Sequence, residues 1–537
     1  MVITEKVQIG NKKVMPFTIP SGIIMTEVSC LERIAKQIPE LGILTTKSIG
    51  SLPRAGNREP IFAQYMPGSF VNAVGLTNPG AEEFAKKLSS ANLPEDRFLL
   101  ASIFGKDESE FVLVAKTLEK CVDGFELNLS CPHAKGYGTQ LGQDKNLVAK
   151  ITHEVVKETG KPVYVKLTPN ASNIGEIAKS AVSAGAEGIV AINTVGPGYY
   201  SVDGNPVLTN KVGGLSGIGI IPIGLKCVRD IRQAIGDSVP IIGMGGIRNA
   251  DDIRAYSEVG ATFFGIGSAL IGMNEPELAG YFAAIYSDLE NGTNNAEKLL
   301  KPVNMRYDRV LIEKKENIAC DFSIIQTDGV TGAEPGQFVF AWIPGVGEKP
   351  FSVMDDNPLT LGVLEKGEFS RKLNSLKEGD SFYVRGPYGQ GVRVSPKSDV
   401  VLVGGGSGIA GLYLLAKKLS RESHVLTLLA AKDKNHIAYY NEFKGYGPVM
   451  VATEDGSVGA KGLVTNLMNN LENGSYFFNC GPKAMIDAVL PLESRISSPD
   501  RIYSSVDYMT RCGVGICSSC VDKKGRRTCI DGPFMNS

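Results

Sequence analysis

Four cysteines near the end of the chain have the residue type and spacing of an iron–sulfur ligand set. They are Cys512, Cys517, Cys520 and Cys529, separated by four, two and eight residues in a glycine-containing segment. Four thiolates within 18 residues suit a 2Fe–2S cluster, which carries one electron at a time. A zinc site is the alternative, but zinc sites usually have two Cys-x2-Cys pairs, whereas this segment has one. The spacing therefore predicts one-electron chemistry.

The composition is consistent with a redox enzyme of the cell interior. The chain has 537 residues, of which 43% are apolar, so it can bury several cores. Its net charge is −1 without a long run of one sign, which leaves no basic surface for nucleic acid. The first residues lack the apolar stretch of a signal peptide, and glycines interrupt the apolar run 400–416. We expect a soluble, cytoplasmic protein with no membrane partner.

The elements that must position further chemistry are clearest in the first 300 residues. Short apolar runs alternate there with amphipathic helical stretches, a pattern typical of parallel strands covered on both faces. Eight such units in about 270 residues predict a (β/α)8 TIM barrel, with an open doubly wound sheet as the alternative. The eight runs are residues 17–24, 42–48, 99–105, 124–130, 162–168, 188–194, 240–246 and 263–267.

Polar residues stand at or near the ends of these runs, where a barrel of this kind places its active site. Lys47 and Lys166 end apolar strands, a poor place for an ordinary surface lysine. Asn128 and Asn193 occupy similar positions, and their amides can both donate to and accept from a ring with carbonyl and N–H edges. These residues predict that the active site lies at this end of the barrel.

The second half of the chain changes pattern after a polar stretch at 291–301, which we interpret as a linker. Residues 302–395 contain short strand-like runs and tight turns, which predict a small antiparallel barrel. Residues 396–500 begin with an apolar strand and the glycine-rich turn 404–408, the pattern of an α/β nucleotide-binding domain. We therefore expect domains at 1–298, 302–395, 396–500 and 501–537, the last carrying the cluster.

The segment 126–133, at the end of the fourth predicted strand, reads Glu-Leu-Asn-Leu-Ser-Cys-Pro-His. It resembles the Asn-x-Ser-Cys-Pro-Asn signature of those dihydroorotate dehydrogenases that use cysteine as the catalytic base. The resemblance covers residues 15–275 and implies an FMN enzyme that oxidises dihydroorotate to orotate in pyrimidine synthesis. Supporting matches lie in order at 45–48, 72–80, 165–170, 192–194, 213–217 and 243–247.

The resemblance also implies the role of each site residue. Cys131 is the candidate base, which removes a proton beside a ring carbonyl while a hydride leaves from the ring. A buried structural thiol is the alternative, but a strand-end position favours catalysis. The expected substrate-binding residues are Lys47, Asn72, Gly75, Leu76, Asn128, His133, Asn193 and Thr194. The expected FMN-binding residues are Ser21, Lys47, Asn128, Lys166, Gly217, Gly245, Gly246, Gly267 and Ser268.

One residue departs from the family pattern. His133 stands where most of these enzymes carry a substrate-contacting asparagine. A similar Cys-Pro-His sequence occurs in dihydropyrimidine dehydrogenases, which act on uracil, and a loop histidine without a role is a further alternative. The segment 72–76, Asn-Ala-Val-Gly-Leu, resembles the orotate enzymes and favours them.

Residues 302–537 resemble the electron-transfer subunit of NAD-linked dihydroorotate dehydrogenases, which is related to ferredoxin reductases. In that family an Arg-Pro-x-Ser sequence holds FAD. Its equivalent here has lysine in place of arginine, so it keeps the charge but loses the two-pronged guanidinium. The expected FAD-binding residues are Lys349, Pro350, Phe351, Ser352, Gly367 and Ser370.

Together these features predict one chain in which a catalytic and an electron-transfer subunit are fused. Electrons would pass from dihydroorotate to FMN, then to the 2Fe–2S cluster, FAD and NAD. NAD is expected at the glycine turn 404–408, although no acidic residue marks a ribose site. The alternatives are an NAD(P)H-dependent uracil dehydrogenase, a dihydroorotate dehydrogenase with another acceptor, and a flavin electron carrier without pyrimidine chemistry. The resemblance further implies a homodimer formed through the first barrel.

Overall fold

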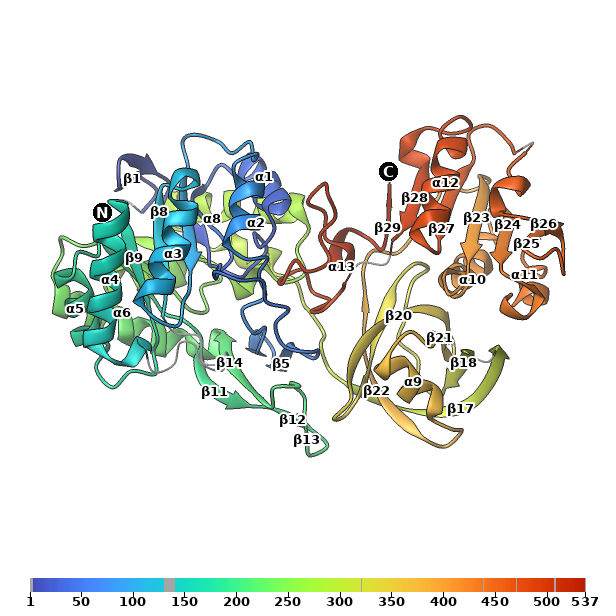
Figure 1. Ribbon diagram of the computed structural model, residues 1–537, viewed down its shortest axis with the longest axis horizontal. Coiled ribbons are helices and arrows are strands. Elements are labelled where there is room, and N and C mark those ends of the chain that lie inside the picture. Colours follow the sequence, from blue (N-terminus) through green and yellow to red (C-terminus); the bar gives the residue numbers. More distant parts are fainter. Residues whose placement is uncertain are drawn as a thin grey trace. The chain divides into compact units, whose positions relative to one another are not determined.

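The computed structural model describes residues 3–129, 141–319, 321–437, 439–469, 471–506 and 509–536 (Figure 1). Two residues of the predicted site, Cys131 and His133, lie outside the described residues. The chain forms two compact units. Unit 1 consists of Met1–Val303 and Val514–Arg526, and unit 2 of Asn304–Gly513 and Arg527–Ser537.

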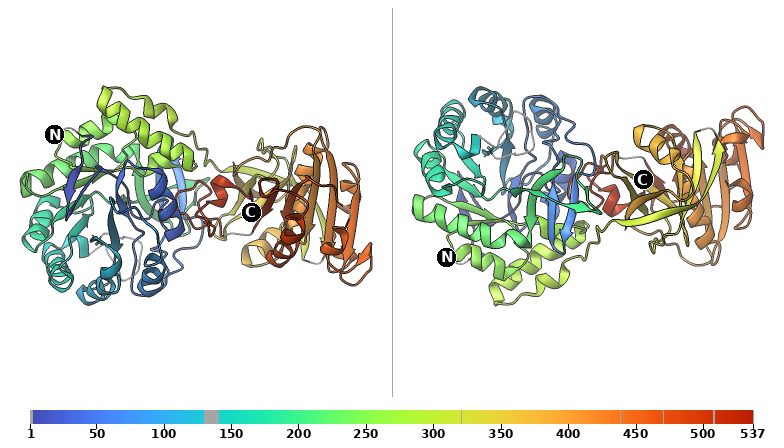
Figure 2. Two further views of the ribbon diagram at one scale, coloured as in Figure 1. Left: turned by 90° about the horizontal axis from the view of Figure 1, so that it is seen from above. Right: turned by 90° about the horizontal axis from the view of Figure 1, so that it is seen from below.

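Unit 1 contains a closed barrel of eight parallel strands, and the predicted barrel is confirmed. Helices surround these strands in a ring (Figure 2). In barrel order the strands are β10 (Gly188–Ala191), β15 (Ile241–Met244), β16 (Phe263–Gly265), β3 (Phe17–Ile19), β4 (Leu41–Thr45), β7 (Phe98–Ile103), β8 (Gly124–Asn128) and β9 (Val163–Leu167). All residues of these strands are buried, which explains why they appear in the sequence as continuous apolar runs.

Several helices of unit 1 begin at a residue whose side chain accepts from the first backbone N–H groups. Asp144 accepts from Asn146 and Leu147 at the start of α4, and Asn274 and Glu277 form a capping box at α8. The α-helices are α1 (Val28–Gln37), α2 (Ala81–Leu88), α3 (Glu108–Leu118), α4 (Lys145–Thr159), α5 (Ile174–Ser183), α6 (Ile221–Ile235), α7 (Ala250–Glu258) and α8 (Glu275–Asn291).

A hairpin of β1 (Val7–Ile9) and β2 (Lys12–Val14) contributes to an apolar cluster inside the barrel. Ile9 and Val14 pack there with Phe98, the first residue of β7, and Tyr164 near the start of β9. Because this cluster fills the amino-terminal end of the barrel, a ligand site is left for the carboxyl ends of the strands.

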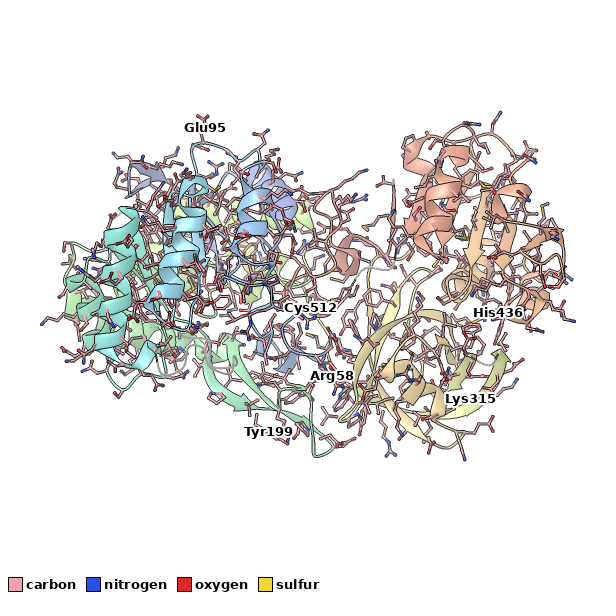
Figure 3. All side chains as sticks on the ribbon, in the orientation of Figure 1. Arg58, Glu95, Tyr199, Lys315, His436 and Cys512 are labelled. Carbon is pink, nitrogen blue, oxygen red and sulfur yellow. The ribbon has the colours of Figure 1, made fainter. Side chains whose placement is uncertain are left out.

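An additional antiparallel sheet in unit 1 is built from the loops that follow barrel strands. Its order is β11 (Val195–Tyr199), β14 (Val212–Gly217), β6 (Ser69–Asn72) and β5 (Phe62–Met66). Asn72 pairs with Gly214 in this sheet, which fixes the position of the asparagine. Tyr199, labelled in Figure 3, is exposed at the end of β11, and a small hairpin of β12 (Ser201–Val202) and β13 (Asn205–Pro206) follows it.

Unit 2 contains a closed antiparallel barrel of six strands, where the sequence predicts a small antiparallel barrel. Helix α9 (Glu368–Ser375) follows its strand β21. In barrel order the strands are β17 (Asp308–Ala319), β18 (Phe322–Thr327), β21 (Leu359–Leu364), β20 (Gly347–Asp356), β19 (Phe338–Ile343) and β22 (Ser381–Tyr388).

The rest of unit 2 is a seven-stranded sheet, parallel except for its last strand. In sheet order the strands are β26 (Ala460–Lys461), β25 (Val449–Thr453), β24 (His424–Ala431), β23 (Asp399–Gly405), β27 (Tyr476–Cys480), β28 (Ile502–Ser505) and β29 (Phe534–Asn536). Its α-helices are α10 (Gly408–Leu419), α11 (Tyr440–Phe443), α12 (Lys483–Glu493) and α13 (Thr528–Asp531).

The last residues of the chain do not form a compact unit of their own. Strands β28 and β29 extend the sheet of unit 2, whereas Val514–Arg526 belongs to unit 1. Within the described part of the chain, no helix is both long and apolar enough to span a membrane.

Candidate functional site

A cavity of about 210 Å³ lies at the carboxyl ends of the strands of unit 1. It brings together predicted residues from the carboxyl ends of several barrel strands and from the loops that follow them, as the barrel rule requires. The predicted residues that line it are Ser21, Lys47, Asn72, Gly75, Leu76, Asn128, Lys166, Asn193, Thr194 and Ser268. The predicted residues Gly217, Gly245, Gly246 and Gly267 do not line it.

Two lysines give the cavity its charge. Lys47 follows β4 and is 9% exposed, and Lys166 in β9 is 4% exposed. The Nζ atom of Lys166 lies 3.4 Å from Glu126 Oε1 and donates to Ser21 Oγ over 3.2 Å. Two buried ammonium groups at the wall of one cavity make its potential more positive, so the cavity suits a ligand that carries or develops negative charge.

Hydrogen bonds hold the asparagine side chains in place. Asn128 Nδ2 donates to Ser48 Oγ over 2.9 Å, and Asn193 Nδ2 donates to Asn128 Oδ1 over 3.3 Å. Asn72 Nδ2 donates to the carbonyl oxygen of Gly214 over 3.2 Å. Three amides from separate elements are therefore oriented around one cavity, an arrangement suited to a ring with carbonyl and N–H edges.

The apolar side of the cavity was not foreseen from the sequence. Ile23, Phe62, Val74 and Ile271 line it beside the polar groups. Cavities for flat cofactor rings are mostly apolar with a few placed polar groups, so this lining is what an isoalloxazine ring requires. Apolar loop residues have no chemical signature, and only the folded structure identifies them as part of the site.

Two glycine turns pack against each other, and one of them directly follows the cavity residue Ser216. Gly217 and Gly246 both have positive φ, 94° and 85°. A Cβ on Gly246 would lie 2.5 Å from the carbonyl oxygen of Gly217, so neither a side chain nor an ordinary backbone conformation fits there. Such turns expose backbone N–H groups that bind phosphate, which fits the phosphate end of FMN.

The carboxyl-terminal segment of the chain also contributes to this cavity. Ile516 and Cys517, both in the part of unit 1 formed by Val514–Arg526, line it together with the barrel residues. The Ile24 N–H donates to the carbonyl oxygen of Ile516 over 2.8 Å, and the Gly272 N–H donates to that of Val514 over 3.0 Å. One of the four predicted cluster cysteines is therefore placed at the wall of the first site.

The four predicted cluster cysteines are all buried, but they belong to both units. Cys517 and Cys520 lie in unit 1, and Cys512 and Cys529 in unit 2. Among the described residues, no three His, Cys, Asp or Glu side chains are grouped so that they could hold a metal ion. The chemistry of the donor set suits an iron–sulfur cluster, and the cluster stays a prediction.

In unit 2, the backbone of Cys512 is held by a buried ion pair. Arg385 Nη1 donates to the carbonyl oxygen of Cys512 over 3.0 Å, and its Nε donates to Glu348 Oε1 over 2.6 Å. Both charged side chains are fully buried. Burial alone would lower the pKa of Arg385, but the charge of Glu348 raises it well above its ordinary value. The guanidinium therefore stays charged beside the predicted ligand.

A second candidate site in unit 2 brings together three segments of the chain. A Cβ on Gly411 in α10 would lie 3.2 Å from both Ser352 Oγ and Cys480 Sγ, so these two side chains meet at this glycine. A Cβ on Gly408 would lie 2.1 Å from the carbonyl oxygen of Cys480. The glycine turn before α10, the end of β27 and strand β20 therefore adjoin one another, at the carboxyl edge of a parallel sheet where nucleotides bind.

The other predicted FAD residues lie next to this site or serve the local fold. The rings of Phe351 and Phe369 are 6.2 Å apart, which places β20 against the start of α9. Ser370 Oγ accepts from the N–H groups of Lys366 and Gly367 over 2.9 and 3.1 Å, so this hydroxyl caps the helix. Lys349 is exposed on β20, and Pro350 is half-buried.

The first half of the chain matches a known protein family. The family model described as dihydroorotate dehydrogenase matches residues 5–280. The catalytic subunit of dihydroorotate dehydrogenase B (NAD(+)) from Methanocaldococcus jannaschii is 44% identical over 259 residues, 48% of this chain and 83% of that protein. The same subunit from Methanocella arvoryzae is 38% identical over 300 residues, 55% of this chain and 92% of that protein.

A solved structure described as an NADH-dependent reduced ferredoxin-NADP oxidoreductase, studied for flavin-based electron bifurcation, is also similar. It is 30% identical and covers 42% of this chain and 87% of its own, with a TM-score of 0.40.

Proposed function

Because the chain belongs to the dihydroorotate dehydrogenase family, whose flavin enzymes oxidise dihydroorotate to orotate in pyrimidine synthesis, we propose that it links this oxidation to a built-in electron-transfer module. The proposed carriers are FMN, a 2Fe–2S cluster, FAD and NAD, in that order. One observation carries the proposal. Cys517, a predicted cluster ligand, lines the same cavity as Lys47, Asn128 and Lys166.

The substrate half of the cavity suits dihydroorotate. Its carboxylate needs a cation and N–H donors, which Lys47, Asn72 and the backbone at Gly75 and Leu76 can supply. Its ring carbonyls and N–H groups suit the oriented amides of Asn128 and Asn193. Proton removal is assigned to Cys131, which lies outside the described residues but only three positions after Asn128 in the sequence.

The remaining residues of the cavity suit FMN. When bound, FMN supplies an acceptor for the hydride that leaves the substrate ring. We assign Lys166 to counter negative charge on that acceptor, and Ser268 with the turns at Gly217 and Gly246 to its phosphate. Ile23 and Ile271 exclude water from the ring face.

Unit 2 is proposed to take up the electrons. The edge where Ser352, Gly411 and Cys480 meet is assigned to a flavin and a nicotinamide, and the turn 404–408 to the pyrophosphate of NAD. A second flavin is needed because a one-electron centre cannot itself transfer a hydride to NAD.

The decisive experiment reduces the bound flavin anaerobically with dihydroorotate or dihydrouracil and follows its absorbance. Dihydroorotate should bleach the flavin far faster, because dihydrouracil leaves the carboxylate-binding groups unpaired. Asn72→Ala should slow bleaching by dihydroorotate, whereas Asn291→Ala, on the exposed end of α8, should not. Faster bleaching by dihydrouracil would refute the proposed substrate.

A further inference from the structure

Glu126 is a buried carboxylate to which the proposed substrate and flavin contacts give no role. It lies in β8 between Phe125 and Leu127, is 1% exposed, and does not line the cavity. Burying an ionised carboxylate in a barrel interior is costly unless hydrogen bonds and an opposite charge compensate it. Its neighbours therefore indicate what it is for.

Glu126 contacts two residues on neighbouring strands, Lys166 and Ser102. Its Oε1 atom lies 3.4 Å from Lys166 Nζ and accepts a hydrogen bond from Ser102 Oγ over 2.8 Å. Ser102 Oγ lies 2.8 Å from Ser48 Oγ, and Ser48 Oγ accepts from Asn128 Nδ2 over 2.9 Å. One carboxylate oxygen is thus connected to the charged lysine and, through two hydroxyls, to a cavity asparagine.

The carboxylate fixes the direction of this hydrogen-bond chain. An ionised carboxylate only accepts, so the Ser102 hydroxyl must donate to Glu126 and accept from Ser48. Ser48 therefore uses its hydroxyl hydrogen to donate to Ser102, so its oxygen can only accept from Asn128. This requirement turns the Nδ2 group of the Asn128 amide, and not its oxygen, toward Ser48. Asn128 Oδ1 is left to accept from Asn193 Nδ2, as the 3.3 Å contact shows.

We infer that Glu126 is a positioning residue that organises both halves of the active site. It holds the ammonium group of Lys166 at the flavin side, where this group also donates to Ser21 Oγ. Through Ser102 and Ser48 it sets which edge of the Asn128 amide faces the substrate. This inference rests on the proposed function, because it assumes that the cavity holds FMN and orotate.

Two variants separate the two effects. Ser102→Ala breaks the chain to Asn128 but keeps the Glu126–Lys166 pair. It should raise the dissociation constant of orotate about tenfold, the effect of one buried hydrogen bond, and leave the flavin midpoint potential unchanged. Glu126→Gln should weaken orotate binding as well and also shift the midpoint potential to more positive values, because a negative charge near the reduced flavin is lost.

The control is Thr18→Val. It removes a buried hydroxyl of the same barrel that lies 2.9 Å from Thr45 Oγ1 and takes no part in the hydrogen bonds between Glu126 and Asn128. It should change neither quantity. Orotate binding is measured from its effect on flavin absorbance, and the potential by anaerobic titration with reference dyes. If Glu126→Gln does not retain flavin, Ser102→Ala decides alone, and unchanged orotate affinity in it overturns the inference.

The inference would also be overturned if Ser102→Ala shifted the flavin midpoint potential as much as Glu126→Gln does. The contact of Glu126 with Lys166 and its connection to Asn128 would then not act separately. If the wild-type protein binds flavin but not orotate, the proposed function fails and the inference fails with it. If the wild type binds both and the variants match it, the inference alone is wrong.

Discussion

The side-chain hydroxyl of Thr26 donates a hydrogen bond to the backbone carbonyl oxygen of Cys517 over 3.1 Å, across 491 residues of sequence. Neighbouring contacts strengthen this connection: Ser518 Oγ donates to the carbonyl oxygen of Ile24, and Ser29 Oγ to that of Asp522 over 3.4 Å. A Cβ on Gly525 would lie 2.6 Å from the carbonyl oxygen of Ser29. The loop after β3 and the start of α1 thus fix the predicted cluster segment at the edge of the cavity within unit 1.

Cys517→Ser should separate the two halves of the reaction. Dihydroorotate should still reduce FMN, because the proposed substrate- and flavin-binding residues are unchanged, whereas reduction of FAD and NAD should be lost with the cluster. Stopped-flow absorbance resolves the two steps, and Ser519→Ala, between the two predicted cluster ligands of unit 1, is the control. Normal NAD reduction by a cluster-free preparation would contradict the proposed order of carriers.

Thr26→Val should loosen the terminal segment without altering the cavity chemistry. Thr26 is 2% exposed, and valine keeps its shape but removes the donor to Cys517. One such hydrogen bond contributes roughly 1 kcal/mol, so amide hydrogen exchange within Val514–Arg526 should accelerate about fivefold. Thr26→Ser retains the hydroxyl and should behave as wild type. Equal exchange rates in all three proteins would show that this bond does not hold the segment.

Cys131→Ala tests the base. If Cys131 removes the ring proton, the variant should bind FMN normally but be reduced by dihydroorotate at least about a hundredfold more slowly, the low end for general-base catalysis. Cys121→Ala is the matched control, because this half-buried cysteine lies in the turn before β8. Near-normal flavin reduction in Cys131→Ala would remove the assignment.

Much of the barrel of unit 1 was predictable from the sequence, because its strands are buried on both faces. Strand β8, for example, appears in the sequence as the apolar run that begins at Gly124, and the structure ends it at Asn128. Lys47, Asn128 and Lys166 could be assigned to the site because polar residues that end apolar strands meet at one end of a barrel. Their assignment needs only the strand count and the rule for parallel barrels.

The rest of the site depends on tertiary contacts that leave no local pattern. Nothing near Cys517 in the sequence indicates that its backbone contacts Thr26, or that residues 514–526 leave the neighbouring chain to join unit 1. Glu126 is read in the sequence as one polar residue in a strand, and its role depends on the side chains of Ser102 and Lys166 on adjacent strands. Spacing along one segment cannot predict such contacts.

Glu493 should make the stability of unit 2 depend on pH. Burial raises its pKa from the ordinary 4.5 to about 7, while the 2.8 Å hydrogen bond from Asn479 opposes the shift. Between these values the folded state binds more protons than the unfolded state, so the free energy of unfolding falls as pH rises through about 7.

Glu493→Gln should remove this dependence. The variant should be more stable than wild type at pH 8 by up to roughly 3 kcal/mol and little different at pH 5, where the wild-type carboxyl is neutral in the folded state. The free energy of unfolding is measured by denaturant unfolding at both pH values, with Asp487→Asn on the exposed side of α12 as control. An equal loss of stability with pH in wild type and Glu493→Gln would exclude this carboxyl as the cause.

Gly246→Ala should abolish FMN binding by closing the glycine turn. Its φ of 85° disfavours any side chain, and a Cβ would lie 2.5 Å from the carbonyl oxygen of Gly217. Gly204→Ala provides a matched control, because Gly204 has a similar φ of 76° but no atom within 4 Å of its Cβ position. In both variants an alanine must adopt a positive φ, which destabilises the fold. Only in Gly246→Ala must the backbone of the turn also shift, to avoid the carbonyl oxygen of Gly217. Flavin content after purification should therefore be lost in Gly246→Ala and retained in Gly204→Ala, whereas full flavin content in both would show that the contact between Gly217 and Gly246 does not form the phosphate site.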